Sequence, residues 1–110
     1  MANYSVSLDP IFHALSDVTR RDVLKKLANG PASVSELAKG VSMALPSFLK
    51  HLKVLDKSGL IRSEKKGRVR MCELRRENLQ AAEDWLQQQR QLWIDHTDRL
   101  ESYLYSLEDN

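Results

Sequence analysis

Apolar residues recur at helical spacing in two short runs at the start of the chain. The pair Asp9–Pro10 is typical of an N-cap followed by the first helical residue, and it predicts a short helix that ends near Ser16. Asp17 is placed to cap a second helix, in which apolar residues continue until the pair Gly30–Pro31. We therefore expect two short helices before residue 31.

Ser33 and Glu36 have the spacing of a capping box, with Ser33 as the N-cap and Glu36 three residues later. This pattern predicts a brief third helix over 34–39, which Gly40 closes. The apolar residues that this helix is expected to bury are Val34, Leu37 and Ala38.

A fourth helix is expected to begin around Leu45–Pro46 and to end at Ser58–Gly59. Its apolar residues are spaced by three, four and three positions and share one face: Leu45, Phe48, Leu52 and Leu55. The opposite side is polar and basic: Ser47, Lys50, Lys53 and Lys57. Two helices joined by a short glycine-containing turn, the second basic on its outer side, are typical of a helix-turn-helix unit.

Two strands follow directly, over Leu60–Glu64 and Val69–Leu74, with Lys65–Arg68 as the turn between them. Four positive residues lie at or beside this turn: Lys65, Lys66, Arg68 and Arg70. These charges repel one another at the tip of a hairpin, and a bound phosphate backbone removes that cost. The hairpin is therefore predicted to be a basic wing.

From about Glu77 the chain returns to helix, and no glycine or proline follows Gly67. One line of residues repeats every seven positions: Leu79, Leu86, Trp93, Leu100 and Leu107. A second line lies three residues further on: Ala82, Gln89, His96 and Tyr103. About 29 residues at about 1.5 Å each give a helix of about 44 Å, which is too long for so small a domain to cover.

This heptad pattern predicts a homodimerisation helix; the alternative is a long helix folded wholly across its own core. Trp85, Leu92 and Leu104 widen the apolar face, so that one flank can pack on the winged domain while another meets a second subunit. The predicted fold is mainly α with a β-hairpin: a winged helix-turn-helix with a long C-terminal dimerisation helix. We expect one domain in all, with residues 9–76 as its DNA-binding region and residues 77–110 as its dimerisation helix.

The composition excludes several classes of protein. Hydrophobic residues make up 42% and charged residues 29% of the 110 residues, which is typical of a globular protein and not of a disordered chain. No apolar run approaches about 18 residues, so no membrane partner is expected. Met1–Ser5 lacks the basic and apolar regions of an export signal, and we expect a cytoplasmic protein. One cysteine and three scattered histidines have no zinc-finger spacing, so neither a metal nor a cofactor is expected.

The net charge of +2 hides a division between two segments. Residues 20–76 carry 15 Lys and Arg against five Asp and Glu, whereas residues 77–110 carry two against eight. A basic middle and an acidic end favour a polyanion on the first segment and a protein partner on the second. Double-stranded DNA is therefore the expected partner of the basic segment.

Several of these segments, in this order, resemble ArsR-type (ArsR/SmtB) winged helix-turn-helix regulators. They lie within residues 9–107: Phe12–Arg21, Ser35–Ala38, Leu45–Leu55, Ser58–Ile61 and Gly67–Arg70. The resemblance implies a dimeric bacterial DNA-binding regulator, usually a repressor, that releases its operator on a signal.

The chain departs from this family pattern at informative positions. Many relatives carry proline at the position of Val18 and a serine or threonine at that of Ala44, so a side-chain cap is missing at the start of the fourth helix. Leu49 replaces a small polar residue, which exchanges a hydrogen bond for apolar contact with a thymine methyl group. The cysteine pair of metal-sensing relatives is absent from the third helix.

These patterns assign residues to two surfaces. The expected DNA contacts are Ser47, Leu49, Lys50, His51, Lys53, Lys65, Lys66, Arg68 and Arg70. The expected dimer interface contains Leu79, Leu86, Trp93, Leu100, Tyr103 and Leu107. His51 has two open interpretations, a phosphate contact or a support of its helix, and His13 is expected to be structural.

Cys72 and His96 each have a structural and a functional interpretation. Cys72 is either a half-buried filler of the second wing strand or a redox sensor whose thiol pKa Arg62 and Arg70 lower. His96 lies on the heptad seam, which favours a packed interface residue over a metal ligand acting with Asp98 or Glu101. The two tryptophans are expected to anchor the core or the dimer; the alternative is an aromatic pocket for a small ligand.

The chain has no phosphate-binding glycine loop and no recognisable catalytic triad, so an enzyme is not expected. The favoured function is a sequence-specific DNA-binding transcriptional regulator, a dimeric repressor of an inverted-repeat operator. Two alternatives stay open: a metal-, small-molecule- or redox-responsive sensor of the same family, and a dimeric protein-interaction module without DNA binding. No residue pattern identifies a small-molecule effector.

Overall fold

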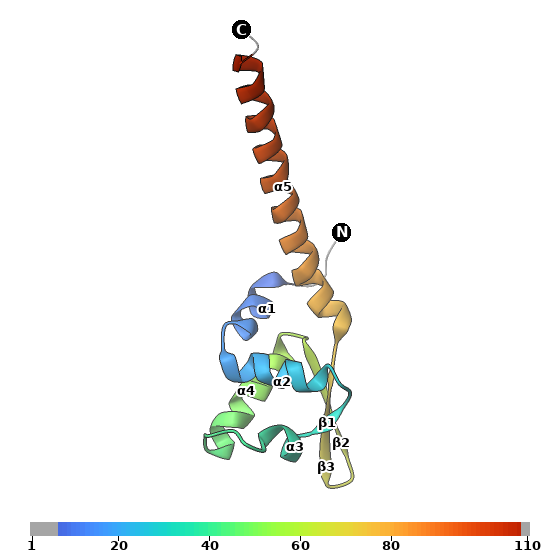
Figure 1. Ribbon diagram of the computed structural model, residues 1–110. Helices are drawn as coiled ribbons and strands as arrows, with labels where there is room; N and C mark the ends of the chain where they lie inside the picture. Colours follow the sequence, from blue (N-terminus) through green and yellow to red (C-terminus); the bar gives the residue numbers. More distant parts are fainter. Residues whose placement is uncertain (1–6, 109–110) are drawn as a thin grey trace.

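The computed structural model describes residues 7–108, and its elements follow the predicted order (Figure 1). The helices are α1 (Leu8–Leu15), α2 (Val18–Leu27), α3 (Val34–Ala38), α4 (Leu45–Lys57) and α5 (Arg76–Glu108). The strands are β1 (Ala32–Ser33), β2 (Ile61–Lys66) and β3 (Val69–Leu74). The stretch Met1–Ser5 and the last two residues of the predicted segment 77–110 lie outside the described residues.

The first helix begins earlier than the sequence predicts. Its N-cap is Ser7, so the prediction that Asp9 caps the helix and Pro10 opens it is wrong by two residues. Asp9 lies in the first turn, where a carboxylate interacts favourably with the positive end of the helix dipole. Pro10 is the third helical residue, and its missing N–H costs nothing because the first N–H groups of a helix have no internal acceptor.

The predicted caps of α2 and α3 are confirmed. The Asp17 carboxylate accepts a hydrogen bond from the backbone N–H of Arg20 at 3.1 Å. Ser33 and Glu36 form both bonds of the capping box, each at 3.1 Å. α3 buries Leu37 and only partly buries Val34 and Ala38, and it ends one residue before the predicted Lys39.

α4 has the predicted bounds, but the apolar spacing predicts the burial of one residue that is in fact exposed. Phe48, Leu52 and Leu55 are buried, whereas Leu45 is 54% exposed. Leu45 is the first residue of the helix, and no neighbouring element covers that end (Figure 1). The N-cap Ala44 makes no side-chain hydrogen bond, and its carbonyl accepts from the N–H groups of Ser47 and Phe48 at 3.1 Å.

The predicted hairpin is part of a three-stranded antiparallel sheet with the order β1-β3-β2. β1 pairs Ala32 with Cys72 and Ser33 with Met71, and the sequence analysis did not find it because two residues show no alternation. The wing turn is also shorter than predicted: β2 runs through Lys66, and only Gly67 and Arg68 connect the strands. Gly67 has φ +66°, the left-handed conformation that favours glycine in a tight turn.

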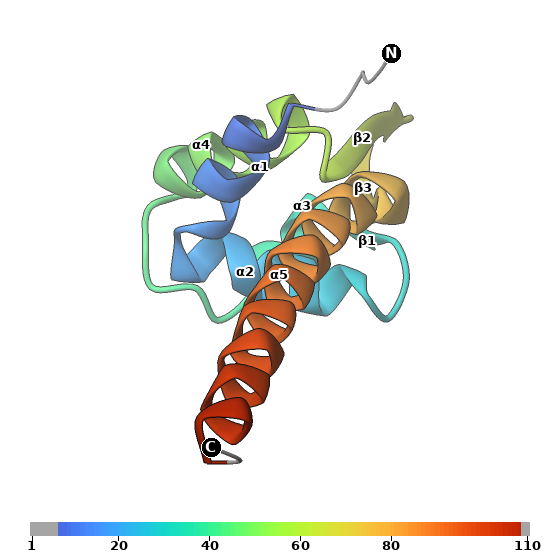
Figure 2. The same ribbon diagram turned by 90° about the horizontal axis from the view of Figure 1, so that it is seen from above.

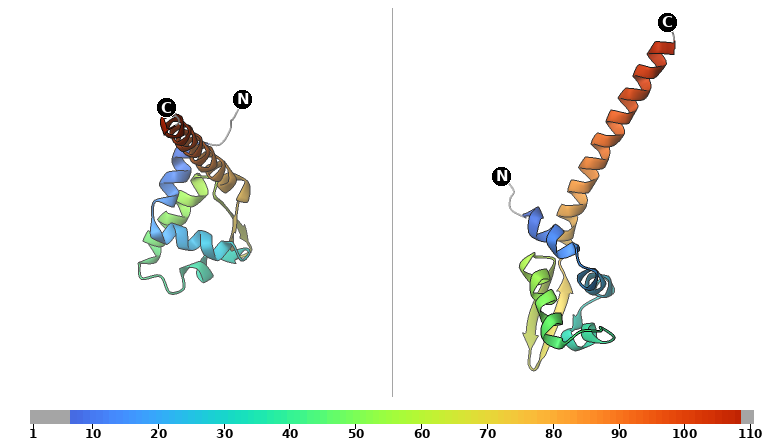
Figure 3. Two further views of the ribbon diagram at one scale, coloured as in Figure 1. Left: turned by 45° about the horizontal axis from the view of Figure 1, so that its top comes forward. Right: turned by 90° about the vertical axis from the view of Figure 1, so that its left-hand side faces the viewer.

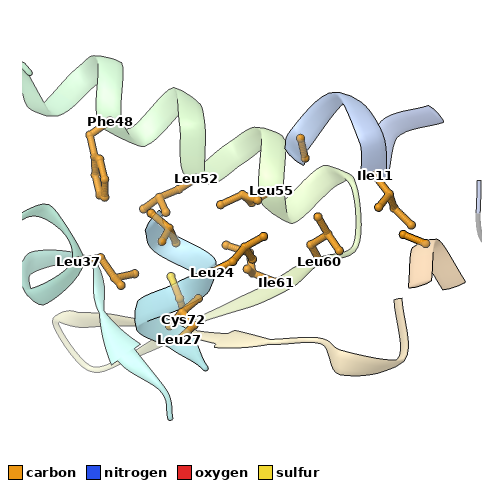
Figure 4. Packing of buried hydrophobic residues seen from close by; sticks show 13 residues of the cluster. Ile11, Leu24, Leu27, Leu37, Phe48, Leu52, Leu55, Leu60, Ile61 and Cys72 are labelled. Carbon is orange, nitrogen blue, oxygen red and sulfur yellow. The ribbon is translucent and has the colours of Figure 1, made fainter. Parts of the chain in front are cut away.

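The core lies between the helices and one face of the sheet. Figure 4 shows Phe48, Leu52 and Leu55 of α4 facing Leu24 of α2 and Cys72 of β3 across this core. Ile11 and Ala14 of α1, Leu37 of α3, Leu60 and Ile61 at the start of the hairpin, and Ala82 of α5 complete it. Packing on several elements fixes α4 relative to the wing.

α5 leaves this core after its first turns. Every residue from Glu83 to Glu108 is exposed, and the molecule measures 75 × 35 × 22 Å along its principal axes. Its 33 residues extend about 50 Å. The helix starts beside β3 and ends far from α4, opposite the wing tip (Figures 1, 2 and 3). The alternative of a helix folded wholly across its own core is therefore wrong.

The first turns of α5 pack on the winged domain. Leu79 is partly buried against the core, and the ring of Trp85 meets that of Phe12 edge-on with centroids 5.6 Å apart. Within the described part of the chain, no helix combines the length and apolar character needed to cross a membrane.

Gly59 lies between α4 and β2, and its contact with Asn78 in the first turn of α5 generates a stability prediction. It has φ +83°, and a Cβ there would lie 2.7 Å from Nδ2 of Asn78, whose side-chain amide donates to the Gly59 carbonyl. We expect Gly59→Ala to lower the free energy of unfolding by about 2–3 kcal/mol, from backbone strain and a displaced hydrogen bond. Urea denaturation measures this loss.

The matched control is Gly67→Ala, because Gly67 also has a positive φ but no atom within 4 Å of the added Cβ. This variant is expected to lose only about 1 kcal/mol. Equal losses in the two variants would show that the contact with Asn78 contributes nothing.

Candidate nucleic-acid interface

The outer side of α4 is a row of exposed polar and basic side chains. Ser47, Lys50 and Lys53 are exposed on the side opposite the buried Phe48 and Leu55, as their spacing predicts. Leu49 is also exposed and borders this row. The helix therefore offers a hydroxyl, two ammonium groups and one apolar side chain to a partner.

The wing places two positive side chains opposite each other. Lys65 pairs with Arg70 in the β2–β3 register, and the next pair inward on the same face of the sheet is Ser63 with Cys72. Paired residues share a face, so Lys65 and Arg70 extend the face that packs on α4. Arg70 also donates to the Ser63 hydroxyl at 3.3 Å. Like charges directly opposite are unfavourable, and an anionic partner would relieve this repulsion.

The cations of α4 and of the wing face a common space. A hollow of about 190 Å³ lies between α4 and the hairpin. Leu49 and Lys53 line it from α4, and Arg70 lines it from β3, with the carboxylate of Asp56 also on its wall. A polyanion that follows the outer side of α4 would therefore also meet the wing.

The positive residues of this surface have no acidic partners. Among residues 7–108, no ion pair involves any of the following: Lys50, Lys53, Lys65, Lys66, Arg68 and Arg70. The neighbouring carboxylates of the sheet, Glu64 and Glu73, each lie 3.9 Å from the guanidinium of Arg62 instead. The outer side of α4 and the wing tip therefore carry positive charge that no neighbouring carboxylate compensates.

His51 does not lie on the exposed row. Its ring is partly buried, and its Nδ1 atom lies 2.9 Å from Nη1 of Arg20 and 3.6 Å from the Asp17 carboxylate. This contact supports the interpretation of His51 as a support of its helix; a phosphate contact stays a prediction. Partial burial pushes the pKa of Asp17 upward, but the hydrogen bond from the Arg20 backbone N–H and the neighbouring Arg20 charge hold it below its usual value.

Arg20 is the residue that the sequence analysis misjudged. It counts among the 15 basic residues of segment 20–76, which is expected to bind a polyanion, but it is only 8% exposed. Its Nε donates to the Ala14 carbonyl at 2.8 Å and its Nη2 to the His13 carbonyl at 3.0 Å. The spacing of Arg20 could have indicated its burial. Arg20 lies three and four positions before the buried Val23 and Leu24, which places it on the apolar face of α2.

Cys72 is more deeply buried than the sequence analysis predicts. Only 1% of the residue is exposed, and burial raises the pKa of its thiol, against the opposing effect of the Arg70 charge. The predicted lowering of this pKa is therefore wrong, and the redox-sensor interpretation loses its physical basis.

The remaining candidates lie apart from this surface. His13 contributes its backbone carbonyl to Arg20 and to Ser16, and the ring of His96 lies 6.4 Å from that of Trp93 on the exposed part of α5. In the part of the chain that the structure describes, no three His, Cys, Asp or Glu side chains are grouped to hold a metal ion.

Comparison with known proteins agrees with this arrangement. A helix-turn-helix domain family matches residues 15–64. The chain is 38% identical over 68 residues to the HTH-type transcriptional regulator Rv2034 of Mycobacterium tuberculosis, which covers 62% of this chain and 64% of that protein. It is 29% identical over 79 residues to the transcriptional repressor SdpR of Bacillus subtilis, covering 72% of this chain and 88% of the repressor. The match thus spans just under two thirds of the first relative.

A solved structure gives a stronger match. The crystal structure of an ArsR family transcriptional regulator is 56% identical to this chain, with a TM-score of 0.75. The alignment covers 78% of this chain and 94% of that one.

The burial of Cys72 predicts a slow thiol. Alkylation in the native protein is expected to be roughly a hundredfold slower than in the urea-unfolded chain, because the reactive thiolate is disfavoured and access needs local opening. The chain has one cysteine, so modification measured by mass spectrometry reports on this site alone. Native and unfolded rates that agree within about threefold would restore the redox-sensor interpretation.

Proposed function

Because this chain belongs to the ArsR family of transcriptional regulators, we propose that it is a sequence-specific DNA-binding repressor that acts as a homodimer. The observation that carries the proposal is that Lys53 of α4 and Arg70 of the wing, neither of them in an ion pair, line one hollow. We propose repression as the mode of regulation because the similar protein SdpR is a transcriptional repressor. A protein with this role works on the chromosome, so the proposal implies the cytoplasm and no catalytic activity.

The proposed DNA contacts divide into two groups. Ser47, Lys50 and Lys53 enter the major groove, with Leu49 at the margin, and of the two interpretations of His51 we adopt the support of its helix. The wing residues contact the adjacent backbone or minor groove: Lys65, Lys66, Arg68 and Arg70. Residues 9–76 form the DNA-binding region in this proposal, and residues 77–110 form the dimerisation helix.

The homodimer is supported by the exposed apolar face of α5. Leu86, Trp93, Leu100 and Leu107 lie on one heptad line and are 51–71% exposed, and Tyr103 beside them is 60% exposed. A monomer rarely exposes so long an apolar face, and a second copy of the same helix is complementary to it by symmetry. Leu79 is partly occupied by the core of its own chain, so it contributes at most the edge of this interface.

A twofold dimer predicts a twofold operator. Two identical winged domains related by a dyad read an inverted repeat, with half-site centres about 10–10.5 bp apart or a multiple of that spacing. A module that binds only protein would not need the unpaired cations of α4 and the wing.

The DNA contacts are tested by removing single charges. Lys50→Ala and Arg68→Ala are each expected to weaken binding to a labelled duplex and to reduce the slope of log K against log[salt] by about 0.9, because each removes one phosphate-neutralising charge. Fluorescence anisotropy at several salt concentrations measures both quantities. Arg99→Ala, on the exposed part of α5, is the control and is expected to leave both unchanged. Wild-type values in both interface variants would exclude this placement of the DNA.

The dimer is tested at Trp93, which is 71% exposed in the single chain. Trp93→Glu would bury an unpaired charge in the interface at a cost of several kcal/mol and is expected to give monomers in sedimentation experiments. Operator affinity should fall sharply because the half-sites are no longer bound by a linked pair, while non-specific DNA attraction persists.

Gln87→Glu adds the same charge on another side of α5 and serves as the matched control, since it is expected to remain dimeric. A dimeric Trp93→Glu protein would remove Trp93 from the interface. A monomeric one with undiminished operator affinity would contradict the dependence of DNA reading on the dimer.

A further inference from the structure

We propose that Arg20 is a positioning residue for α4, which it holds through the neutral Nε2–H tautomer of His51. The inference rests on the proposed DNA-binding function, because it concerns how the DNA-reading helix is held. It assigns Arg20 no contact with DNA.

The guanidinium of Arg20 occupies a junction between helices. Its Nε and Nη2 groups donate to the carbonyls of Ala14 and His13 in the last turn of α1. Both carbonyls lie at the negative end of the α1 dipole, which compensates the buried positive charge, and the His13 carbonyl also accepts from Ser16. Its backbone N–H is held at the same time by the Asp17 cap of α2. The remaining donor, Nη1, points at His51 of α4.

The contact with His51 determines the protonation of the imidazole. An arginine side chain has donors only and stays protonated in proteins. The Nδ1 atom of His51, 2.9 Å from Nη1, must therefore accept the hydrogen bond and carry no proton. A neutral ring with a free Nδ1 carries its proton on Nε2. The Asp17 carboxylate, 3.6 Å from Nδ1, is beyond hydrogen-bond distance and does not compete for that position.

This hydrogen bond fixes α4 on the side away from the wing hollow. His51 is the middle residue of α4, between the buried Phe48 and Leu52. Apolar packing holds the helix in the core but permits small rotations and shifts, whereas a directional bond to a buried guanidinium, each of whose nitrogens is hydrogen-bonded, does not. Losing the bond should therefore leave the protein folded while displacing Ser47 and Lys50 relative to the bases they read.

A displaced helix affects specific and non-specific binding differently. Non-specific attraction depends on the number of phosphates neutralised, and neither Arg20 nor His51 supplies that charge in this proposal. Base reading depends on the position of side chains in the groove. The proposal thus predicts lower specificity with an unchanged salt slope.

The tautomer is tested without DNA. In ¹⁵N-histidine-labelled protein near neutral pH, the ring nitrogens of His51 are expected to show the Nε2–H form, with His13 and His96 as internal comparisons and His51→Asn to assign the signals. The Nδ1–H form, or a tautomer mixture like that of the exposed rings, would overturn the proposal. This experiment does not depend on the proposed function.

The positioning role is tested with two substitutions of His51 on two duplexes, one selected by the protein from a random pool and one of unrelated sequence. His51→Leu removes the acceptor and is expected to weaken binding to the selected duplex by at least about tenfold, with no change on the unrelated duplex. His51→Asn places an amide oxygen where Nδ1 lies and is expected to stay within about threefold of the wild type. Thermal unfolding checks that both variants fold. If His51→Leu does not fold, the proposal is tested by the binding of His51→Asn to the two duplexes and by the tautomer measured in the wild-type protein.

Two results would overturn the positioning role of Arg20 while leaving the proposed DNA-binding function intact. A salt slope reduced by about 0.9 in both variants would make His51 a phosphate contact. An asparagine variant as weak as the leucine variant would show that the bond to Arg20 does not position the helix. A wild-type protein that binds neither duplex would instead refute the proposed function.

Discussion

A buried guanidinium ties together the helices on which the rest of the fold depends. Arg20 is almost inaccessible, and a buried cation is tolerated only where its donors are paired. Its acceptors come from the end of α1 and the middle of α4, while the residue itself belongs to α2. These helices therefore have to meet at one point, and α4 receives a directional contact that its apolar face alone cannot provide.

The charges of the molecule are sorted between its two ends. α4 and the wing tip carry cations that form no ion pair, whereas α5 runs to the opposite end and carries more acidic than basic residues together with exposed apolar ones (Figures 1 and 3). This separation allows a polyanion and a second protein chain to be bound at the same time without competing for one surface. The proposed repressor needs both, because linked half-sites bind more tightly than single ones.

α5 belongs to the winged domain at its start and extends into solvent over the rest of its length. Its first turns are integrated in the core through Leu79 and Ala82, and the helix then continues with apolar residues in contact with solvent. Burial of such residues is the main favourable term in association, which is why the homodimer proposal rests on this segment. The same reasoning separates Trp85, which meets Phe12 of its own chain, from Trp93, whose indole lies beside His96 on the exposed helix.

The sequence by itself determined the features that depend on near neighbours along the chain. The Asp17 cap, the Ser33–Glu36 capping box and the extent of α4 were all predicted, since caps and helical faces involve residues within four positions. Only the tertiary structure decided the pairing of Ala32 with Cys72, the burial of Arg20 and the orientation of His51 toward it. Those features join residues far apart in the sequence, and burial and hydrogen-bond partners exist only once the elements have packed. The raised pKa of Cys72 has the same origin, because desolvation is a property of the assembled core.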